Sequence, residues 1–594
     1  MKTTLSAAAA ILGSLFLYSA CSSDSPASSG GSSGTGAQPT GSSGASTTAG
    51  TGSGTTAGTG TGVGGSGSGT TAGTGNTTAG TSPTGTGGTP TGTGGTPTGT
   101  AGTGTGGSTN PPPGPALVTS TMGDFWKVGT FTEVTGATAD VTVNDATAAQ
   151  TWEGFGAAFN EKGWSVLTTP ALQDEALKLL FSADGTHFSW GRIPMGASDY
   201  AMDRYTLDDT GTDVDASTGT RPPQDLQLTK FSLARDEMKL IPFIKAAQAI
   251  NPALRFWASP WTPPVWMKTG YKTNSGEDSS QNAKKPSFFD GGTMLSDDAT
   301  LTSFAQYFVK FVQGYKEKGI NVEIVAPANE PNFDQNYPSC IWEKANYAKF
   351  IGKFLGPALM TAGLGTKIML GTLSNGTAGK DADNAAAVLA DATAKGFCTV
   401  AGAQWGMLEG ADKTSAIKAA GIPLWATEHK CGNYPWIKSA QAASATQPAI
   451  PAYATAAAPN DMAYAVESWW YLKNAITTIG VTSYNAWNMV LDPSGLGIDT
   501  TRDWKQNALL VVDGGTLKKT PTYYVFRHLA QYVAPGDKVV ATTGVESLAV
   551  KNTDGSIVAV VFNSGAAKAM FTVALGGKQV QFAMPANGWA TVKL

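Results

Sequence analysis

The chain is poor in the residues that bind metals and cross-link loops. Its 594 residues include only three histidines and four cysteines. Cysteines at 21, 340, 398 and 431 are too widely spaced for a zinc motif. We therefore expect no metal and no cofactor. Charged residues make up 14% of the chain, and the formal net charge is −4. Because nucleic-acid binding needs a basic surface, this charge argues against a nucleic-acid partner.

Long hydrophobic runs are also missing, apart from one at the N-terminus. Residues 7–18 are apolar and follow a single lysine, which is typical of a secretory signal and too short for a stable membrane span. The small pair Ser19-Ala20 then precedes Cys21, an arrangement that resembles a bacterial lipobox. We therefore expect a signal peptide at 1–21, a secreted or cell-surface location, and a lipid anchor at Cys21 as the link to a membrane. The alternative is an ordinary cleaved signal with an incidental cysteine.

The next segment has almost no side chains that could form a core. Residues 22–114 are nearly all Gly, Ser, Thr, Ala and Pro, so burial cannot offset the entropy of ordering them. We expect a flexible linker. The 480 residues after Gly114 carry all 16 tryptophans. That length exceeds the usual size of one core, so a large domain and a smaller one are expected.

Short apolar strands alternate with amphipathic helices through most of this part. One helical pattern places Phe304, Phe308, Phe311 and Tyr315 on a single face. The expected strands are Gly154–Phe159, Phe188–Pro194, Arg255–Ser259, Val322–Ala328, Lys367–Leu373, Ala401–Gln404, Leu424–Thr427 and Ser483–Asn488. Eight such units predict a TIM (β/α)8 barrel. The alternative, an open doubly wound sheet, is disfavoured because no Gly-rich phosphate turn follows an early strand.

Both ends of the folded part show the alternating pattern of antiparallel strands. We expect these ends to meet in a β-sandwich beside the barrel. The predicted organisation is a signal peptide at 1–21, a linker at 22–114, N-terminal strands of the side domain at 115–148, the catalytic barrel at 149–535 and the C-terminal β-sandwich at 536–594.

Polar and aromatic residues collect at the predicted strand ends. Barrel enzymes place their chemistry at the C-terminal ends of the strands. The fourth strand is followed by Asn329 and Glu330, and the seventh delivers Glu428. Because these two strands lie on opposite sides of a barrel mouth, the two glutamates are expected to converge. Further strand-end candidates are Arg192, Asp199, Trp261, Gln404, Trp405, His429 and Trp487.

Two facing carboxyls are the groups that glycosidic bond cleavage requires. One protonates the leaving oxygen, and the other attacks or stabilises the anomeric carbon. We expect Arg192 to favour the ionised form of Glu428, whereas Glu330 needs a raised pKa. Asp199 is a candidate for bonding terminal sugar hydroxyls. His429 is either a substrate contact or a hydrogen-bond partner behind the nucleophile. A single glutamate after a strand is more simply interpreted as an exposed acidic residue of a loop. The catalytic interpretation depends on the occurrence of two, at the fourth and seventh strand ends.

These stretches resemble glycoside hydrolase family 30. The motifs that carry the resemblance are Gly154-Phe155-Gly156, the run from Trp257 to Lys268, Asn329-Glu330-Pro331, Tyr337-Pro338-Ser339-Cys340 and Thr427-Glu428-His429. The resemblance implies a retaining barrel hydrolase with Glu330 as acid/base and Glu428 as nucleophile. It also implies sugar-contacting or supporting roles for Arg192, Trp261, Asn329, Gln404, Trp405 and Trp487. Departures from the family pattern occur at Ala328, at Ala157-Ala158 and at Glu161, all near the rim of the expected cleft.

The substrate is expected to be a β-linked poly- or oligosaccharide or a glycolipid. The run from Trp487 to Asp492 favours a glucan or glucoside, as in β-1,6-glucanases and glucosylceramidases, over a β-1,6-galactan or xylan. The alternative of another class is a non-catalytic carbohydrate-binding adhesin. Cys340 and Cys431 both follow catalytic strands, so either a disulfide across the rim or two free thiols is open.

Overall fold

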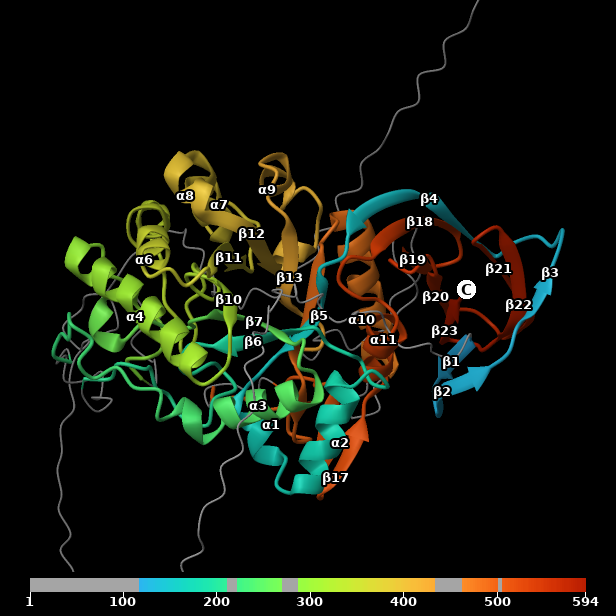
Figure 1. Cartoon of the computed structure of the whole chain (residues 1–594), viewed down its shortest axis with the longest axis horizontal. Coiled ribbons are helices and arrows are strands. Elements are labelled where there is room, and N and C mark those ends of the chain that lie inside the picture. Colours follow the sequence, from blue (N-terminus) through green and yellow to red (C-terminus); the bar gives the residue numbers. More distant parts are fainter. Residues whose placement is uncertain (1–116, 211–221, 270–286, 433–461, 500–504) are drawn as a thin grey trace, which may run out of the picture. The chain divides into compact units, whose positions relative to one another are not determined.

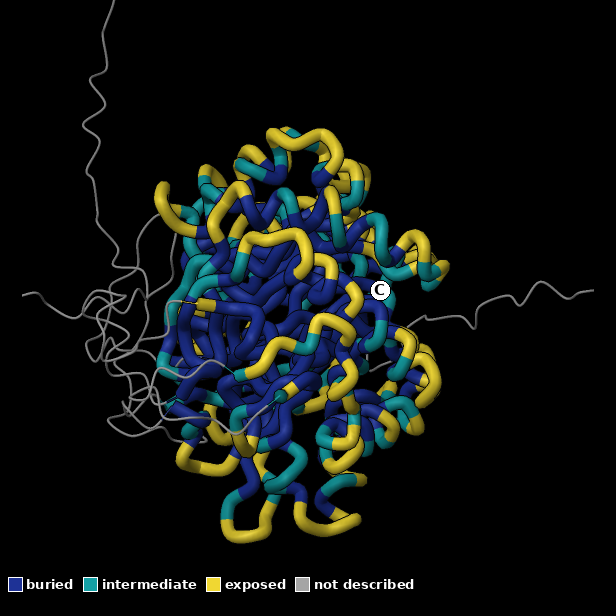
Figure 2. Tube along the Cα trace, turned by 90° about the vertical axis from the view of Figure 1, so that its left-hand side faces the viewer, coloured by how far each residue is buried: buried dark blue, intermediate teal, exposed yellow. Residues whose placement is uncertain are grey.

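The computed structural model describes residues 117–210, 222–269, 287–432, 462–499 and 505–594. The predicted signal peptide and linker, including Cys21, lie outside these residues. Figure 1 traces the described elements along the chain, and Figure 2 shows buried residues in the interior beneath exposed loops. No helix within the described ranges has the length and apolar character needed to cross a membrane.

Eight parallel strands close into a barrel in the expected chain order, which confirms the predicted fold. They are β5 (Gly154–Ala158), β6 (Trp190–Pro194), β7 (Arg255–Ser259), β10 (Val322–Val325), β11 (Lys367–Leu373), β12 (Cys398–Gln404), β13 (Leu424–His429) and β14 (Ser483–Asn488). Pairing of β14 with β5, from Ser483 opposite Gly154 to Asn488 opposite Ala158, closes the ring. In an open sheet these two strands would be edge strands and would not pair with each other, so the doubly wound alternative is wrong.

Helices connect the barrel strands, in places with more breaks than the sequence suggested. They are α1 (Glu161–Val166), α2 (Pro170–Phe181), α3 (Leu240–Ile250), α4 (Asp298–Glu317), α5 (Lys344–Lys349), α6 (Gly356–Thr361), α7 (Asp381–Ala390), α8 (Ala392–Phe397), α9 (Ser415–Ala419), α10 (Met462–Asn474) and α11 (Pro521–Ala530). A π-helical segment, Phe350–Leu355, joins α5 to α6.

Helix α4 shows how local sequence sets these elements. The side chain of Asp297 caps its N-terminus by accepting a hydrogen bond from the backbone N–H of Thr300. The predicted face is fully buried along its length, at Phe304, Phe308, Phe311 and Tyr315. Helix α2 begins in the same way, with Thr169 as the N-cap and a proline in the first turn.

Tryptophans fill the inside of the barrel. Trp190, Trp257 and Trp425 form an interior cluster with Ile324, Ala326, Met369 and Val400 from neighbouring strands. Trp190 and Trp425 pack edge to face, with ring centroids 4.7 Å apart. Because the side chains of this layer are buried against one another, they form a packed floor under the C-terminal ends of the strands.

Strands from both ends of the described chain share one ten-stranded sheet beside the barrel. The blue N-terminal and red C-terminal strands are seen together in Figure 1. They are β1 (Leu117–Thr121), β2 (Asp124–Gly129), β3 (Thr132–Val134), β4 (Val141–Thr151), β18 (Lys538–Gly544), β19 (Ser547–Lys551), β20 (Ile557–Asn563), β21 (Lys568–Leu575), β22 (Lys578–Met584) and β23 (Gly588–Lys593). The sheet encloses a core of its own, which confirms the side β-sandwich built from both ends.

Short strands that the sequence pattern did not predict complete the fold. Val490–Leu491 (β15), Leu510–Asp513 (β16) and Thr516–Lys519 (β17) form a small sheet after the eighth barrel strand. Lys268–Thr269 (β8) pairs with Thr293–Met294 (β9) after the third. Strands of two to four residues carry too little periodicity to be recognised in a sequence.

Candidate active site

A shift in strand pairing directs Glu428 into the barrel mouth. On β13, Leu424 and Ala426 pack outside the barrel while Trp425 faces inside, so simple alternation would send Glu428 outward. Between β12 and β13, however, Ala403 lies opposite Ala426 whereas Gln404 lies opposite Glu428. This bulge adds one residue to β13, and such irregularities reorient side chains beside active sites.

Glu330 follows the fourth barrel strand in an uncommon backbone conformation. Its φ is +43°, in the left-handed region that non-glycine residues rarely adopt. Its backbone N–H donates to the carbonyl of Thr372 at 3.1 Å, and Asn329 forms a β-bridge with the same residue. Trp405, at the end of β12, has a φ of +45°. Left-handed residues of this kind persist where the surroundings hold them, often at functional sites.

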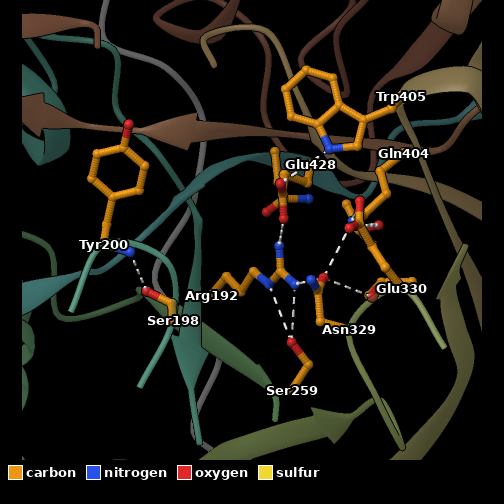
Figure 3. Close-up of polar contacts among 12 residues, drawn as sticks. Arg192, Ser198, Tyr200, Ser259, Asn329, Glu330, Gln404, Trp405 and Glu428 are labelled. Carbon is orange, nitrogen blue, oxygen red and sulfur yellow. Dashed lines mark hydrogen bonds and ion pairs between the residues drawn. The ribbon is translucent and has the colours of Figure 1, made fainter. Parts of the chain in front are cut away.

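Arg192 on β6 ties the two strand ends together (Figure 3). The guanidinium is fully buried and pairs through Nη1 with Oε2 of Glu428. Its Nη2 donates to Oδ1 of Asn329 at 2.6 Å and to Oγ of Ser259 at 3.1 Å. Trp405 donates its indole N–H to Oε1 of Glu428 at 3.1 Å. Both oxygens of the Glu428 carboxyl therefore have a donor.

Glu330 receives a weaker set of partners. Its Oε1 accepts a hydrogen bond from the amide Nε2 of Gln404 at 3.0 Å, and the same amide also contacts Oδ1 of Asn329 at 3.2 Å. The hydroxyl of Thr427 donates to Oε1 of Gln404 at 3.2 Å, which fixes the orientation of that amide. Gln404 and Asn329 thus link the carboxyl of Glu330 to Arg192 and, through it, to Glu428.

Burial and charge raise the pKa of the two glutamates by different amounts. Burial, reinforced by repulsion from Glu428, places the pKa of Glu330 well above its ordinary value of 4.5. Burial also raises the pKa of Glu428, but Arg192 and Trp405 oppose that effect. The arginine therefore lessens the increase without reversing it, which corrects the expectation of a simple depression. Of the two groups, Glu330 has the pKa that is raised further.

Three tryptophans surround the arginine. The guanidinium carbon of Arg192 lies 4.3 Å from the ring centroid of Trp261, 4.9 Å from that of Trp257 and 5.4 Å from that of Trp487. Trp261 and Trp487 stack with centroids 5.4 Å apart. Stacking of this kind holds a cation in place while leaving its donors to the carboxylate.

Asp199 and His429 occupy different parts of the site. Asp199 follows β6 and is buried, and its negative charge contributes to the raised pKa of Glu330. His429 is the last residue of β13, and its Nδ1 is 3.1 Å from the hydroxyl of Tyr484 on the neighbouring strand β14. Its ring packs against Trp405 and Tyr471, at centroid distances of 5.5 Å and 4.8 Å. Of the two roles open for His429, the hydrogen bond to Tyr484 favours a supporting role next to Glu428 over a direct contact with substrate.

Several residues of the site were not singled out from the sequence. Trp257 underlies Arg192, and Thr372 and Thr427 bond the side chains of Asn329 and Gln404. Trp257 could have been found, because it lies two residues before Ser259 on the same face of the third strand. Thr427 opens the Thr427-Glu428-His429 motif, which gave it a signal but no role, whereas Thr372 carried no signal.

The cysteines in the described ranges are free thiols. Cys340, Cys398 and Cys431 are all buried and unpaired with one another, so the disulfide alternative for Cys340 and Cys431 is wrong. Burial raises the pKa of the Cys340 thiol to about 12, so the thiolate that would form a bridge is scarce. Within the same ranges, no group of three or more His, Cys, Asp and Glu side chains is arranged to hold a metal ion.

A closed barrel whose mouth holds two buried glutamates is the architecture of a barrel glycoside hydrolase. Family models agree with this class. The glycosyl hydrolase family 30 TIM-barrel domain matches residues 152–533, and the glycosyl hydrolase family 30 beta sandwich domain matches residues 536–592. The chain therefore belongs to glycosyl hydrolase family 30. It is a glycoside hydrolase, and the adhesin alternative is set aside.

Individual relatives cover different shares of the chain. A stretch of 239 residues is 34% identical to endo-1,6-beta-D-glucanase neg1 of Aspergillus fumigatus, spanning 39% of this chain and 46% of that protein. A match of 442 residues at 26% identity to lysosomal acid glucosylceramidase of Mus musculus spans 71% of this chain and 76% of that protein. This chain thus covers less than half of the fungal glucanase.

Solved structures share the fold. SrfJ from Salmonella typhimurium is 21% identical and the endo-beta1,6-glucanase BT3312 is 23% identical. Each gives a TM-score of 0.63 and covers 80% of this chain and 98% of its own. At this level of identity, the likeness describes architecture alone.

Proposed function

We propose that the chain is a retaining β-glycoside hydrolase in which Glu428 is the nucleophile and Glu330 is the acid/base. The observation that carries the proposal is the unequal hydrogen bonding of two buried carboxyls at the fourth and seventh strand ends. Glu428 is bonded by a guanidinium and an indole, whereas Glu330 is bonded by one neutral amide. A nucleophile must start ionised and a general acid must start protonated.

In the first step, the Glu428 carboxylate attacks the anomeric carbon while Glu330 gives its proton to the leaving oxygen. A covalent glycosyl-enzyme ester forms, and the glycosidic C–O bond breaks. In the second step, Glu330, now ionised, takes a proton from water, which attacks the same carbon and releases Glu428. Arg192 holds the nucleophile in place throughout, because its other bonds fix it to Asn329 and Ser259.

The substrate side of the proposal is a β-1,6-linked glucan, with a β-glucoside such as glucosylceramide as the alternative. The names of the fungal and mouse relatives support these two classes. Asn329 is suited to the hydroxyl beside the anomeric carbon, and the buried, stacked pair of Trp261 and Trp487 supports Arg192. Asp199 can accept hydrogen bonds from hydroxyls of the terminal sugar.

The same proposal places the protein outside the cell on a lipid anchor at Cys21. The support is the signal-like run followed by Ser19-Ala20-Cys21 and the Gly/Ser/Thr/Pro-rich residues 22–114. A long tether between membrane and catalytic domain would let the barrel reach an insoluble polysaccharide.

Replacement of Glu428 by Gln tests the mechanism. We expect kcat to fall by roughly 10⁴-fold or more, because a covalent nucleophile is lost while the shape of the side chain is kept. The matched control is Glu317→Gln, at an exposed position at the end of α4, which should leave activity unchanged. Retention of activity within about tenfold would remove Glu428 from the nucleophile role.

A second experiment addresses stereochemistry and substrate together. Soluble β-1,6-glucan, β-1,6-galactan, xylan and aryl β-glucosides are incubated with the enzyme, and the first product anomer is identified by NMR. The proposal requires β-products from a β-1,6-glucan or β-glucoside. An α-product would indicate inversion and overturn the double displacement.

A further inference from the structure

One buried carboxylate outside the strand ends joins the loop that carries Glu330 to its neighbours. Asp381 is the first residue of α7 and is 1% exposed. Its Oδ1 accepts a hydrogen bond from the backbone N–H of Asn332 at 2.8 Å. Its Oδ2 accepts from the N–H of Ser374 at 2.6 Å, from the Ser374 hydroxyl at 2.9 Å and from the N–H of Asn375 at 3.3 Å.

These partners come from loops after consecutive barrel strands. Asn332 follows β10, and Ser374 and Asn375 follow β11. The carbonyl of Ser374 in turn accepts a hydrogen bond from the N–H of Met407 at 2.9 Å, within the 3-10 turn after β12 that begins with Trp405. Asp381 therefore connects the loops that present Glu330 and Trp405.

The hydrogen bond from Asn332 to Asp381 uses the backbone N–H group that lies nearest to Glu330 on its C-terminal side. Residue 331 is a proline and has no N–H, so the N–H of Asn332 is the first backbone donor after Glu330. Asp381 takes that donor, while Thr372 takes the N–H of Glu330 itself. These two bonds bracket the left-handed backbone of Glu330 on both sides.

The hydrogen-bond donors around Asp381 favour the ionised form of its carboxyl. Three of its four partners are backbone N–H groups, which can only donate, so the arrangement suits an ionised carboxylate. Burial raises the pKa of Asp381, and these hydrogen bonds oppose that effect. The helix N-terminus at which it lies also favours a negative charge.

We propose that Asp381 is a positioning residue that fixes the backbone of the Glu330 loop and sets a buried carboxylate at the base of that loop, close to the acid/base. The inference rests on the proposed function, because it assigns a task only if Glu330 is the acid/base. Asp381 does not touch the reacting atoms; it acts through Glu330.

Several charged groups from different elements bear on Glu330. They are Glu428 on β13, Asp199 after β6 and Asp381 on α7, all of which raise its pKa, with Gln404 opposing them as a neutral donor. The neighbouring cation, Arg192, is engaged by Glu428 and Asn329. Removal of the Asp381 charge should therefore shift the proton equilibrium of Glu330 in one direction, toward ionisation.

The test compares Asp381→Asn with Asp383→Asn. Asp383 lies two residues further along the same helix, bonded to the N–H of Gly379 and to Lys344 at the surface, and serves as the matched control. For Asp381→Asn, the alkaline limb of kcat/KM should move about 0.5 pH unit lower, because a like charge near Glu330 is lost. The control should retain the wild-type profile.

Leaving-group dependence gives a second readout. 2,4-Dinitrophenol departs without protonation, whereas a sugar hydroxyl needs the acid. Asp381→Asn should lower kcat/KM on soluble β-1,6-glucan roughly tenfold and on 2,4-dinitrophenyl β-gentiobioside by less than about threefold. Equal losses on both substrates with an unmoved alkaline limb would mean a merely structural residue and overturn the proposal.

Three further variants separate the possible outcomes. Asp381→Glu retains the charge, so its alkaline limb should stay at the wild-type pH even if its rate falls; a limb that moves as in the Asn variant overturns the charge role. If Asp381→Asn does not fold, Ser374→Ala removes one of the four bonds and should show the same substrate-selective loss, about fivefold. Glu330→Gln on the same two substrates separates the proposals: full activity on glucan would refute the acid/base assignment itself.

Discussion

At the scale of single residues, two chemically identical side chains are made different by their partners. Glu330 and Glu428 are both buried, and burial raises the pKa of both carboxyls. A buried cation beside Glu428 opposes the increase, whereas repulsion adds to it at Glu330. The proton that the pair holds therefore stays with Glu330. This asymmetry, rather than the presence of two acids, is what a double displacement requires.

The asymmetry predicts the pH profile of kcat/KM. Activity should fall at high pH as Glu330 loses its proton and at low pH as Glu428 gains one. Because both pKa values are raised, both limbs of the bell should lie above the ordinary glutamate value of 4.5. Initial rates across pH, measured below KM, provide the check; an alkaline limb at or below 4.5 would contradict it.

The indole of Trp405 predicts a separate effect on Glu428, the proposed nucleophile. Trp405→Phe keeps an aromatic ring beside His429 but removes the donor to Oε1 of Glu428. Loss of a hydrogen bond to a charged group costs about 1.5–3 kcal/mol, so kcat/KM should fall roughly 10- to 100-fold. The acidic limb should also move to higher pH. Trp164→Phe, a half-buried tryptophan of α1, is the control and should leave both quantities unchanged.

At the scale of elements, one strand of the side domain serves two cores. On β20, Ile557, Ala559 and Val561 face the core of the sandwich. Val558, Val560 and Phe562 on the opposite face belong to the main core that also covers the barrel. Because every residue of the strand is buried, the sandwich and the barrel are packed together through apolar contact.

A histidine adds a polar link at the same junction. His528 on α11 is buried, with Nδ1 2.8 Å from Oγ1 of Thr591 on β23 and Nε2 2.8 Å from Oγ of Ser120 on β1. The Thr591 hydroxyl donates its proton to the carbonyl of His528, so it accepts from Nδ1–H. Burial disfavours the charged imidazolium, so in the neutral ring Nε2 accepts from the hydroxyl of Ser120.

This histidine predicts a loss of stability in acid. Burial lowers the pKa of His528 from 6.5 to about 3. Between these values the unfolded chain binds a proton and the folded chain does not, so its contribution is full above pH 6.5 and is lost as pH falls. The loss is about 1.4 kcal/mol of unfolding free energy per pH unit. Denaturant unfolding at pH 7.5 and pH 5 should show a smaller change in unfolding free energy between the two pH values for His528→Asn than for the wild type. An equal change in both proteins would refute the role of His528.

At the scale of the whole molecule, the catalytic part and the proposed tether are separate in sequence. Every site residue and both cores lie between residues 117 and 594. The segment before them carries the signal-like run, Cys21 and a composition unsuited to a core. Attachment of the chain to a membrane through Cys21 should therefore change where the enzyme acts and leave its rate on soluble substrate unchanged.

Replacement of Cys21 by Ala tests the attachment. In a bacterial host, the wild-type chain should collect in the membrane fraction, and Cys21→Ala should not, because the lipid-bearing thiol is absent. Ser22→Ala is the matched control and should stay in the membrane fraction. Both variants should hydrolyse soluble substrate at the wild-type rate. Continued membrane partition of Cys21→Ala would argue against the anchor.

Sequence alone determined the architecture of the described part and the identity of its candidate acids. Apolar periodicity identified eight strands in the right order, and polar residues at their ends pointed to the barrel mouth, because strand ends of a closed barrel converge whatever the details. Only the tertiary structure decided how Glu428 turns inward, why Glu330 adopts a left-handed backbone, and where Asp381 links the loops. These three features are a shift in strand pairing, a backbone angle and a hydrogen bond between distant loops. They depend on which strands lie side by side, and a local sequence pattern does not contain that information.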